Sequence, residues 1–332
     1  MSERWGDDQA GVGGFAGTVD EVAGTSAGAA PQAVAALRRR PGRGWRRRER
    51  PRYSAKEIML AVLLLAPSIV VFVMFFYRPF LNLLNWGTFE SRQGGAFFED
   101  VGLSQYREEL TSDDFREGLW HSVQFVLYTV PPGLILGVLL GVAAHRKLAG
   151  IKAFQVIFSS TLASSVAVTS VLFFYLFNPV VGTFRVDWLN DPDMAMFAVA
   201  LSSVWQNMGL SFIIVLAGLQ AVPDEVMEAA TLDGYGPARR LLRITLPLIS
   251  PVLLFLLVVL VIFGFQAFAQ IDIITNGAPA GATETLVFKI NRLVRPDNIG
   301  IGAVYSVGLF FVTLVVTALQ FVILERRVHY AR

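Results

Sequence analysis

The sequence predicts an all-α integral membrane protein with six transmembrane helices. Of the 332 residues, 54% are hydrophobic and only 16% are charged, and the mean hydropathy is positive, which is more apolar sequence than a soluble core needs. Six stretches lack Asp, Glu, Lys and Arg and are long enough to cross the ~30 Å hydrocarbon layer of a bilayer. They are residues 58–77, 121–144, 153–177, 194–219, 248–271 and 299–324.

The residues before the first stretch have two different compositions. Residues 1–36 are rich in Gly, Ala, Thr and acidic side chains and lack an apolar period, which predicts disorder. Arginines then crowd between Arg38 and Arg52. Such a run can bind nucleic acid or anionic lipid, but directly before an apolar stretch it favours a basic anchor at the lipid surface. We expect a tail over residues 1–52, a membrane domain over residues 53–332, and no nucleic-acid partner.

The distribution of basic residues predicts the orientation of the helices. Most of the 28 Lys and Arg lie before the first stretch, after the last one, or in alternate connections between them. Because cytoplasmic segments carry the excess of Lys and Arg, both termini and the connection 220–247 are expected in the cytoplasm. The connections 78–120 and 272–298 are then outside.

The connection 220–247 contains signals for a helix that ends in a tight turn. Pro223 can start a helix where its missing N–H is harmless, and acidic residues follow it in the first turn. This helix is expected to end near Asp233. Gly234 can then adopt the positive φ that a helix end commonly requires.

A second short helix is expected after this turn. Pro237 can open it, and it would run through Arg243 before Pro247 closes it. In the first helix, Ala229 and Ala230 offer a surface of small residues into which another protein can press. The alternative, from amphipathicity alone, is a connector that lies on the lipid headgroups.

Neutral polar side chains inside the stretches predict a solute pathway. Such groups are costly against lipid and tend to point into the bundle. The Ser and Thr row of the third stretch also fits close helix packing. Amides are harder to explain as packing, and next to aromatic rings they resemble a site for a polyol. The predicted pathway residues are Trp205, Gln206, Asn207, Gln266 and Gln270.

Several chemistries are disfavoured by what the sequence lacks. The stretches contain no acidic residue, Lys or Arg for a proton-coupled or sodium-coupled carrier, although an ion-coupled secondary transporter of a polar solute remains the alternative. No G-x-x-x-x-G-K-[ST] loop is present, so ATP would be hydrolysed by another polypeptide. The chain has no Cys and only 3 His, which are far apart, so we expect no metal site and no cofactor.

Residues 228–247 resemble the docking loop in permease subunits of ATP-binding-cassette (ABC) importers. They read EAATLDGYGPARRLLRITLP. Three residues separate Glu-Ala-Ala from Gly234, and nine residues separate Gly234 from I-x-L-P. Tyr235 departs from the family's usual alanine. Over residues 55–330 the chain is similar to binding-protein-dependent carbohydrate importer permeases of the maltose and glycerol-3-phosphate type. Supporting matches are residues 101–106, 177–179, 203–205, 217–223, 276–279 and 283–286.

This resemblance implies a type I ABC importer permease fold with a cytoplasmic docking (coupling) helix in the bacterial cytoplasmic membrane. The docking residues it implies are Glu228, Ala229, Ala230, Asp233, Gly234, Arg239 and Arg240. The implied partners are a second homologous permease, two ATPase subunits that bind ATP and magnesium, and an extracytoplasmic solute-binding protein, which would contact residues 78–120 and 272–298. This chain would do no covalent chemistry. The implied cargo is sn-glycerol-3-phosphate or a glycerophosphodiester, with a sugar as the other option.

Overall fold

The computed structural model describes residues 54–92, 95, 97–145, 150–184 and 187–325, so the predicted tail 1–52 lies outside the described residues. The chain divides into two compact units, Met1–Ser68 and Ile69–Arg332. The described part of the first unit belongs to one apolar helix. The helical bundle discussed below belongs to the second unit.

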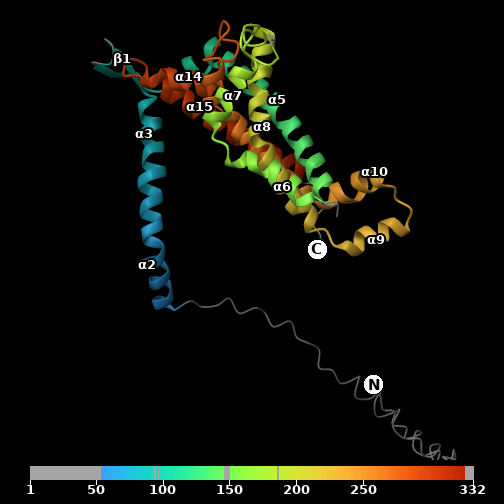
Figure 1. Ribbon diagram of the computed structural model, residues 1–332. Coiled ribbons are helices and arrows are strands. Elements are labelled where there is room, and N and C mark those ends of the chain that lie inside the picture. The colour runs from blue at the N-terminus through green and yellow to red at the C-terminus, as the bar shows by residue number, and fades with distance from the viewer. Residues whose placement is uncertain (1–53, 93–94, 96, 146–149, 185–186, 326–332) are drawn as a thin grey trace, which may run out of the picture. The chain divides into compact units, whose positions relative to one another are not determined.

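Helices dominate the described residues (Figure 1). They are α2 (Ala55–Phe72), α3 (Arg78–Trp86), α4 (Ser104–Leu110), α5 (Asp113–Ala144), α6 (Ile151–Ser159), α7 (Val166–Leu176), α8 (Pro192–Gln220), α9 (Asp224–Leu232), α10 (Pro237–Arg240), α11 (Leu246–Leu248), α12 (Ser250–Phe265), α13 (Ala269–Ile274), α14 (Leu286–Leu293) and α15 (Ile299–Leu324). Strands β1 (Phe89–Arg92) and β2 (Phe97–Asp100) pair antiparallel in a hairpin that the sequence analysis did not predict.

Four described helices are long and apolar enough to cross a membrane, and the count reaches six if each of two bent helix pairs forms one span. The first span is longer than predicted, because the helix continues through the π-helical turn Val73–Tyr77 and past Arg78 to Trp86. The second also begins earlier, at Asp113. The predicted stretches stopped at the first charged residue, whereas the helices themselves continue past such residues.

The third predicted stretch is a broken span. α6 and α7 are inclined by 101° to each other, with a 3-10 turn, Ser160–Ala163, and two extended residues between them. Before the break, the hydroxyls of Ser159, Ser160 and Thr161 donate to carbonyls three residues earlier. Such local bonds compete with regular helix bonds, which accounts for a break in this serine-rich stretch.

The fifth stretch is bent at its start and interrupted at its end. The helical run that begins at Pro237 continues through a π-helical turn, Leu241–Thr245, to Leu248, and α12 then leaves at 74°. The prediction that Pro247 closes the short helix was therefore wrong. Pro247 lies in the first turn of α11, where the absence of its N–H is tolerated. At the other end, α12 stops at Phe265 and α13 begins at Ala269.

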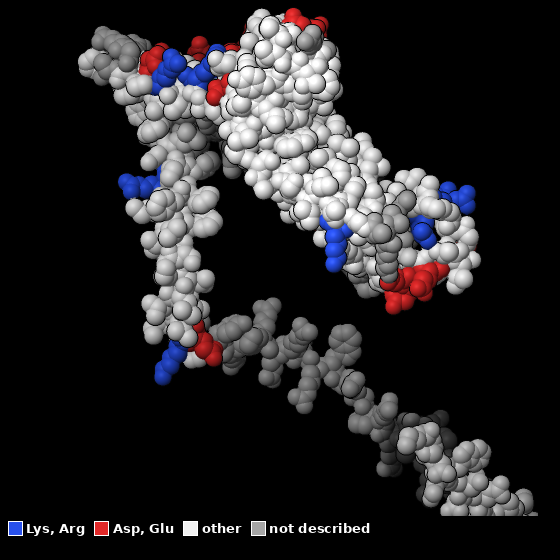
Figure 2. Space-filling view, viewed as in Figure 1, with Lys and Arg blue, Asp and Glu red and all other residues white. Residues whose placement is uncertain are grey.

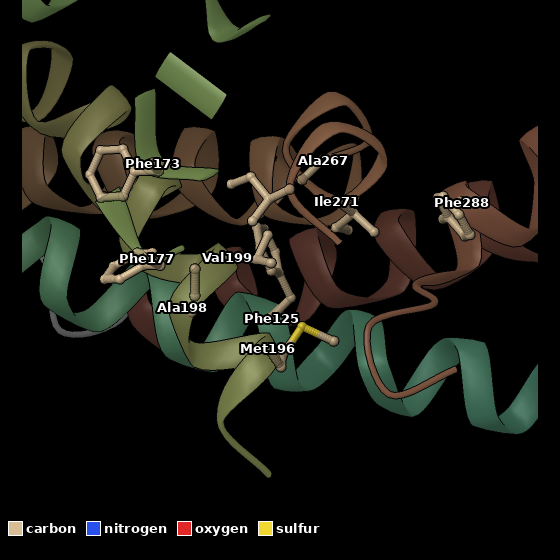
Figure 3. Close-up of a cluster of buried hydrophobic side chains, with 11 residues drawn as sticks. Phe125, Phe173, Phe177, Met196, Ala198, Val199, Ala267, Ile271 and Phe288 are labelled. Atoms are coloured by element: carbon tan, nitrogen blue, oxygen red, sulfur yellow. The ribbon is translucent and has the colours of Figure 1, made fainter. Parts of the chain in front are cut away.

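The bundle is built around the contact between α5 and α8. Gly137 and Gly141 of α5 lie against Ser211 and Val215 of α8, so the two helices approach closely where α5 has no side chain. A buried apolar cluster, drawn in Figure 3, joins α5, α7, α8, α13 and α14. Its members include Phe125, Phe173, Phe177, Met196, Val199, Ala267, Ile271 and Phe288.

The two ends of this bundle differ from its sides. The α9–α10 loop lies at one end, and the β1–β2 hairpin and α14 lie at the other, which we call the hairpin end (Figure 1). Figure 2 shows charged side chains of the bundle gathered at these ends, with an uncharged surface between them in this view. This is the pattern of a protein whose sides face lipid.

Gly137→Ala is expected to destabilise the bundle. A methyl group there would lie 2.7 Å from Ser211 Cβ and 3.1 Å from the Ser211 carbonyl carbon, so α5 and α8 would have to move apart. We expect a loss of about 1–3 kcal/mol, the usual cost of overpacking. Thermal unfolding of the purified protein in detergent measures the loss. Gly133→Ala is the control, because its methyl would make an ordinary 3.6 Å contact with Leu260, and equal stabilities would contradict the close-approach argument.

Candidate functional site

A cavity of about 520 Å³ lies between α8 and the junction of α12 with α13. Four of the five predicted pathway residues line it, together with Ser203 and mostly apolar neighbours such as Phe268 and Leu210. The four are Gln206, Asn207, Gln266 and Gln270. They come from α8 and from the α12–α13 junction, which are far apart in sequence, so the fold brings together the amides that the sequence analysis selected.

Gln206 is already engaged in hydrogen bonds within the protein. Its amide N–H donates to the carbonyl of Ser164 at 2.8 Å, and its amide oxygen accepts from the hydroxyl of Thr169. Ser164 lies at the break between α6 and α7, and Thr169 lies in the first turn of α7. A broken span leaves backbone carbonyls without helical partners, and in a membrane they must be satisfied by protein groups. Gln206 therefore braces the broken span in addition to lining the cavity.

Asn207, Gln266 and Gln270 differ from Gln206. Among the described residues, none of these three side-chain amides makes a hydrogen bond to another protein group. Gln270 is buried, Asn207 is half-buried and Gln266 is exposed. Each amide carries both donors and acceptors. These three side chains can therefore bind a solute without first breaking an internal hydrogen bond.

Ser203 was not among the predicted pathway residues. It is buried and lines the cavity, and its hydroxyl has no partner among the residues that the structure describes. The sequence did contain a usable signal, because residues 203, 206, 207 and 210 recur at the three- and four-residue spacing of one helix face. The adjacent Ser202 is equally buried, but its hydroxyl donates to the carbonyl of Val199 at 2.7 Å.

Trp205 does not line this cavity. Its ring lies 6.1 Å from the ring of Phe173, and both residues line a separate apolar pocket. Trp205 faces a different side of α8 because it falls between the cavity positions in the helical repeat. The aromatic residues that line the amide cavity are Phe125, Phe263 and Phe268, and the ring of Phe268 stacks on that of Phe288 at 6.2 Å.

The helix-turn signals around Gly234 agree with the backbone geometry. α9 ends at Leu232, and Gly234 has a φ of 78°. The N–H of Gly234 donates to the carbonyl of Thr231, and the N–H of Tyr235 donates to the carbonyl of Ala230. These two bonds form a Schellman motif, which satisfies the last carbonyls of the helix.

The predicted docking residues lie in this loop with unequal exposure. Glu228, Ala229, Asp233 and Arg239 are exposed, but Ala230 is buried and so contributes to packing of the loop rather than to its surface. Arg240 folds back, and its guanidinium donates to the hydroxyl of Thr231 at 2.7 Å.

A hollow of about 510 Å³ opens between α9 and Arg240. It is lined by Asp224, Met227, Glu228, Thr231, Leu232 and Arg240, and Leu232 is 89% exposed. The loop thus offers a surface with an acidic group, a basic group and a large uncovered apolar side chain. A surface of this composition fits a protein partner.

Comparison with known proteins identifies the family. Residues 133–330 match the model for binding-protein-dependent transport system inner membrane components. Among curated relatives, the sn-glycerol-3-phosphate transport system permease protein UgpA of Agrobacterium fabrum is 34% identical over 283 residues, covering 82% of this chain and 97% of that protein. The UgpA protein of Salmonella typhimurium is 33% identical, covering 82% of this chain and 96% of that protein.

Solved structures with the same fold include a chain of a bacterial alginate ABC transporter in complex with a periplasmic protein. It has a TM-score of 0.69 at 21% identity and covers 80% of this chain and 93% of that chain. A chain of the MetNI methionine ABC transporter has a TM-score of 0.50 at 14% identity, covering 66% of this chain and 100% of that chain. The protein is thus a multi-pass membrane protein that belongs to the binding-protein-dependent transport system inner membrane components, and it is a permease subunit of an ABC importer.

Proposed function

We propose that this permease carries sn-glycerol-3-phosphate or a glycerophosphodiester into the bacterial cytoplasm. The observation that carries the proposal is the amide-lined cavity between α8 and the α12–α13 junction. Amides donate to and accept from hydroxyl groups, and an aromatic ring such as Phe268 can cover the C–H face of a polyol. The names of relatives at 33–34% identity support the same solute class.

A neutral sugar is the second candidate. None of the described residues that line the cavity is an acid, a lysine, an arginine or a histidine. A phosphate group would therefore need its cationic partner outside this lining, for example from the second permease subunit. A sugar would need no such partner, and the neutral lining favours it on that point.

The proposal includes an assembly and an orientation. A second homologous permease, two ATPase subunits and an extracytoplasmic solute-binding protein would complete the importer. The α9–α10 loop would dock on an ATPase in the cytoplasm, where both termini would also lie. ATP and magnesium would be bound by the ATPase subunits. The exposed Glu228 and Leu232 would contact the ATPase, and the movement of the two ATPase subunits would reach the cavity through α8 and α12, which flank the loop.

Uptake by the reconstituted complex tests the proposed function. Proteoliposomes that contain both permeases, the ATPases and the binding protein are expected to accumulate labelled sn-glycerol-3-phosphate. Vanadate is expected to stop uptake, whereas a protonophore is expected to leave uptake unchanged. Uptake that collapses with the protonophore and needs no ATPase would establish the secondary-transporter alternative. Uptake of a labelled sugar, with no uptake of sn-glycerol-3-phosphate, would favour the second candidate.

Asn207→Leu and Gln206→Leu are expected to behave differently. Loss of the Asn207 amide removes hydrogen bonds to the solute, so the half-saturating concentration should rise roughly two- to tenfold while stability is kept. Gln206→Leu leaves the Ser164 carbonyl and the Thr169 hydroxyl without their partner, so the complex should also unfold at a lower temperature. Uptake and thermal unfolding of both variants would be compared. Identical behaviour in both measurements would contradict the separate roles.

Ser203→Ala is expected to weaken transport without weakening the fold. Its buried hydroxyl has no partner in the described chain, so removing it should leave stability unchanged or raise it by up to ~1 kcal/mol. The half-saturating solute concentration should rise because the solute loses one hydrogen bond. Ser202→Ala is the control, since that hydroxyl bonds to its own helix. A Ser203→Ala variant with unchanged uptake would show that this hydroxyl does not contact the solute.

Gly234→Val is expected to uncouple ATP hydrolysis from transport. Nothing lies within 4 Å of the position that a Cβ would take, so the cost comes from the φ of 78° alone and is about 1 kcal/mol or more. Gly234→Asn is the matched variant, because asparagine tolerates this conformation. Membrane insertion, copurification of the ATPase and solute-stimulated ATP hydrolysis would be measured. Normal coupling in the valine variant would exclude a role for the turn geometry.

A further inference from the structure

Lys289 is a buried cation at the hairpin end of the bundle. Its side chain is 5% exposed, and its ammonium donates to one carboxylate oxygen of Asp114 and, at 3.1 Å, to Glu117. The hydroxyl of Tyr305 donates to the other carboxylate oxygen of Asp114 at 3.0 Å. These four residues, which we call the Lys289 latch, join α14, α5 and α15.

The latch holds a charged lysine. Burial lowers the pKa of Lys289, but the hydrogen bonds and negative charges of Asp114 and Glu117 outweigh burial and raise the pKa above its ordinary value. The two carboxylates are more than half exposed and so remain hydrated. Loss of either carboxylate would therefore leave the lysine as a buried charge with fewer partners, and such a charge is costly.

The same face of α5 forms the seat of α14. A Cβ at Gly118 would lie 3.1 Å from the Lys289 side chain, so α14 comes close to α5 where α5 lacks a side chain. One turn further on, the hydroxyl of Ser122 accepts from the N–H of Leu286 at 2.8 Å. Residues 114, 117, 118 and 122 recur at the three- and four-residue spacing of one helix face. The latch is thus the charged end of a continuous contact.

The latch is connected to the amide cavity through two aromatic rings. Phe288 precedes Lys289 in α14, is buried in the apolar cluster of Figure 3, and stacks on Phe268 at 6.2 Å. Phe268 lines the cavity. A shift of α14 relative to α5 would therefore move Phe288 away from Phe268, and Phe268 would lose the ring that supports it in the cavity lining.

We propose that Lys289 is a positioning residue for solute binding: through the latch it fixes α14 on α5 and so holds Phe288 behind the cavity residue Phe268. The proposal rests on the proposed role of the cavity as the solute site. It adds that solute affinity depends on an ion pair outside the cavity. It also assigns the segments 78–120 and 272–298 to one mechanical unit, because Asp114 and Glu117 belong to the first and Lys289 to the second.

The test compares Lys289→Met with the wild type in the complete importer. Methionine keeps an unbranched side chain but removes the charge. The half-saturating sn-glycerol-3-phosphate concentration for uptake is expected to rise about tenfold in complexes that assemble normally, and Lys289→Arg should recover most of the loss. Asp113→Asn is the matched control, because Asp113 is one position away on α5, forms an exposed pair with Arg116 at 3.5 Å and does not line the cavity.

A second readout does not depend on the transported solute. The chain contains no Cys, so an Ala269→Cys substitution in the cavity lining gives a single thiol. Lys289→Met is expected to change the rate at which a polar maleimide modifies this thiol several-fold. Asp113→Asn is expected to leave that rate unchanged. If Lys289→Met changes neither the half-saturating solute concentration nor the labelling rate, the proposal is overturned. The same holds if Lys289→Met only lowers the number of assembled complexes and leaves those two values as in the wild type. If the wild type takes up no solute, the proposed function fails, whereas labelling still tests the latch.

Discussion

The architecture depends on one constraint: backbone that is not helical has to find its hydrogen-bond partners within the protein when it lies in the membrane. Two interruptions of helical backbone border the cavity, the break between α6 and α7 and the junction of α12 with α13. At the first break the amide of Gln206 takes up the carbonyl of Ser164, so a side chain on α8 replaces a missing helical bond. The break between α6 and α7 is tolerated because a neighbouring side chain completes it, and that same side chain lines the cavity.

The same constraint explains which polar groups can serve a passing solute. Amides and hydroxyls that complete the backbone are committed, as Gln206 and Ser202 are. Others in the same helix are held in place by packing and keep their hydrogen-bonding capacity, as Ser203 and Asn207 do. Residue type does not separate the two groups, because Ser202 is committed and Ser203 is not. One face of α8 therefore carries both Gln206, which braces the broken span, and Ser203 and Asn207, whose polar groups keep their hydrogen-bonding capacity.

Local patterns in the sequence predicted local structure well. Gly234 was expected to end a helix with a positive φ because few other residues can do so, and the Schellman motif has that geometry. The amides of α8 and the α12–α13 junction were selected because amides are costly in lipid, and four of them line one cavity. Their roles toward a solute stay predictions.

Features that depend on tertiary contacts were not predictable from the sequence. The break after α6 needs both a serine-rich stretch and a distant glutamine that completes it, and only the first is visible locally. Pro247 looked like a helix end, but a π-helical turn before it lets the helix continue. Lys289 carries no local signal of its burial, because its partner Asp114 lies 175 residues away.

The long helix α5 connects distant parts of the permease mechanically. It runs for 32 residues without interruption, which corresponds to about 48 Å, and it carries the Lys289 latch in its first turns. A tilt of about 5° at one end would displace the other end by roughly 4 Å over that length. Midway, Pro131 and Pro132 remove two backbone hydrogen bonds, so the helix is most compliant there. α5 is thus a lever with a soft midpoint, and bending at Pro131 and Pro132 takes up part of a tilt before it reaches the other end.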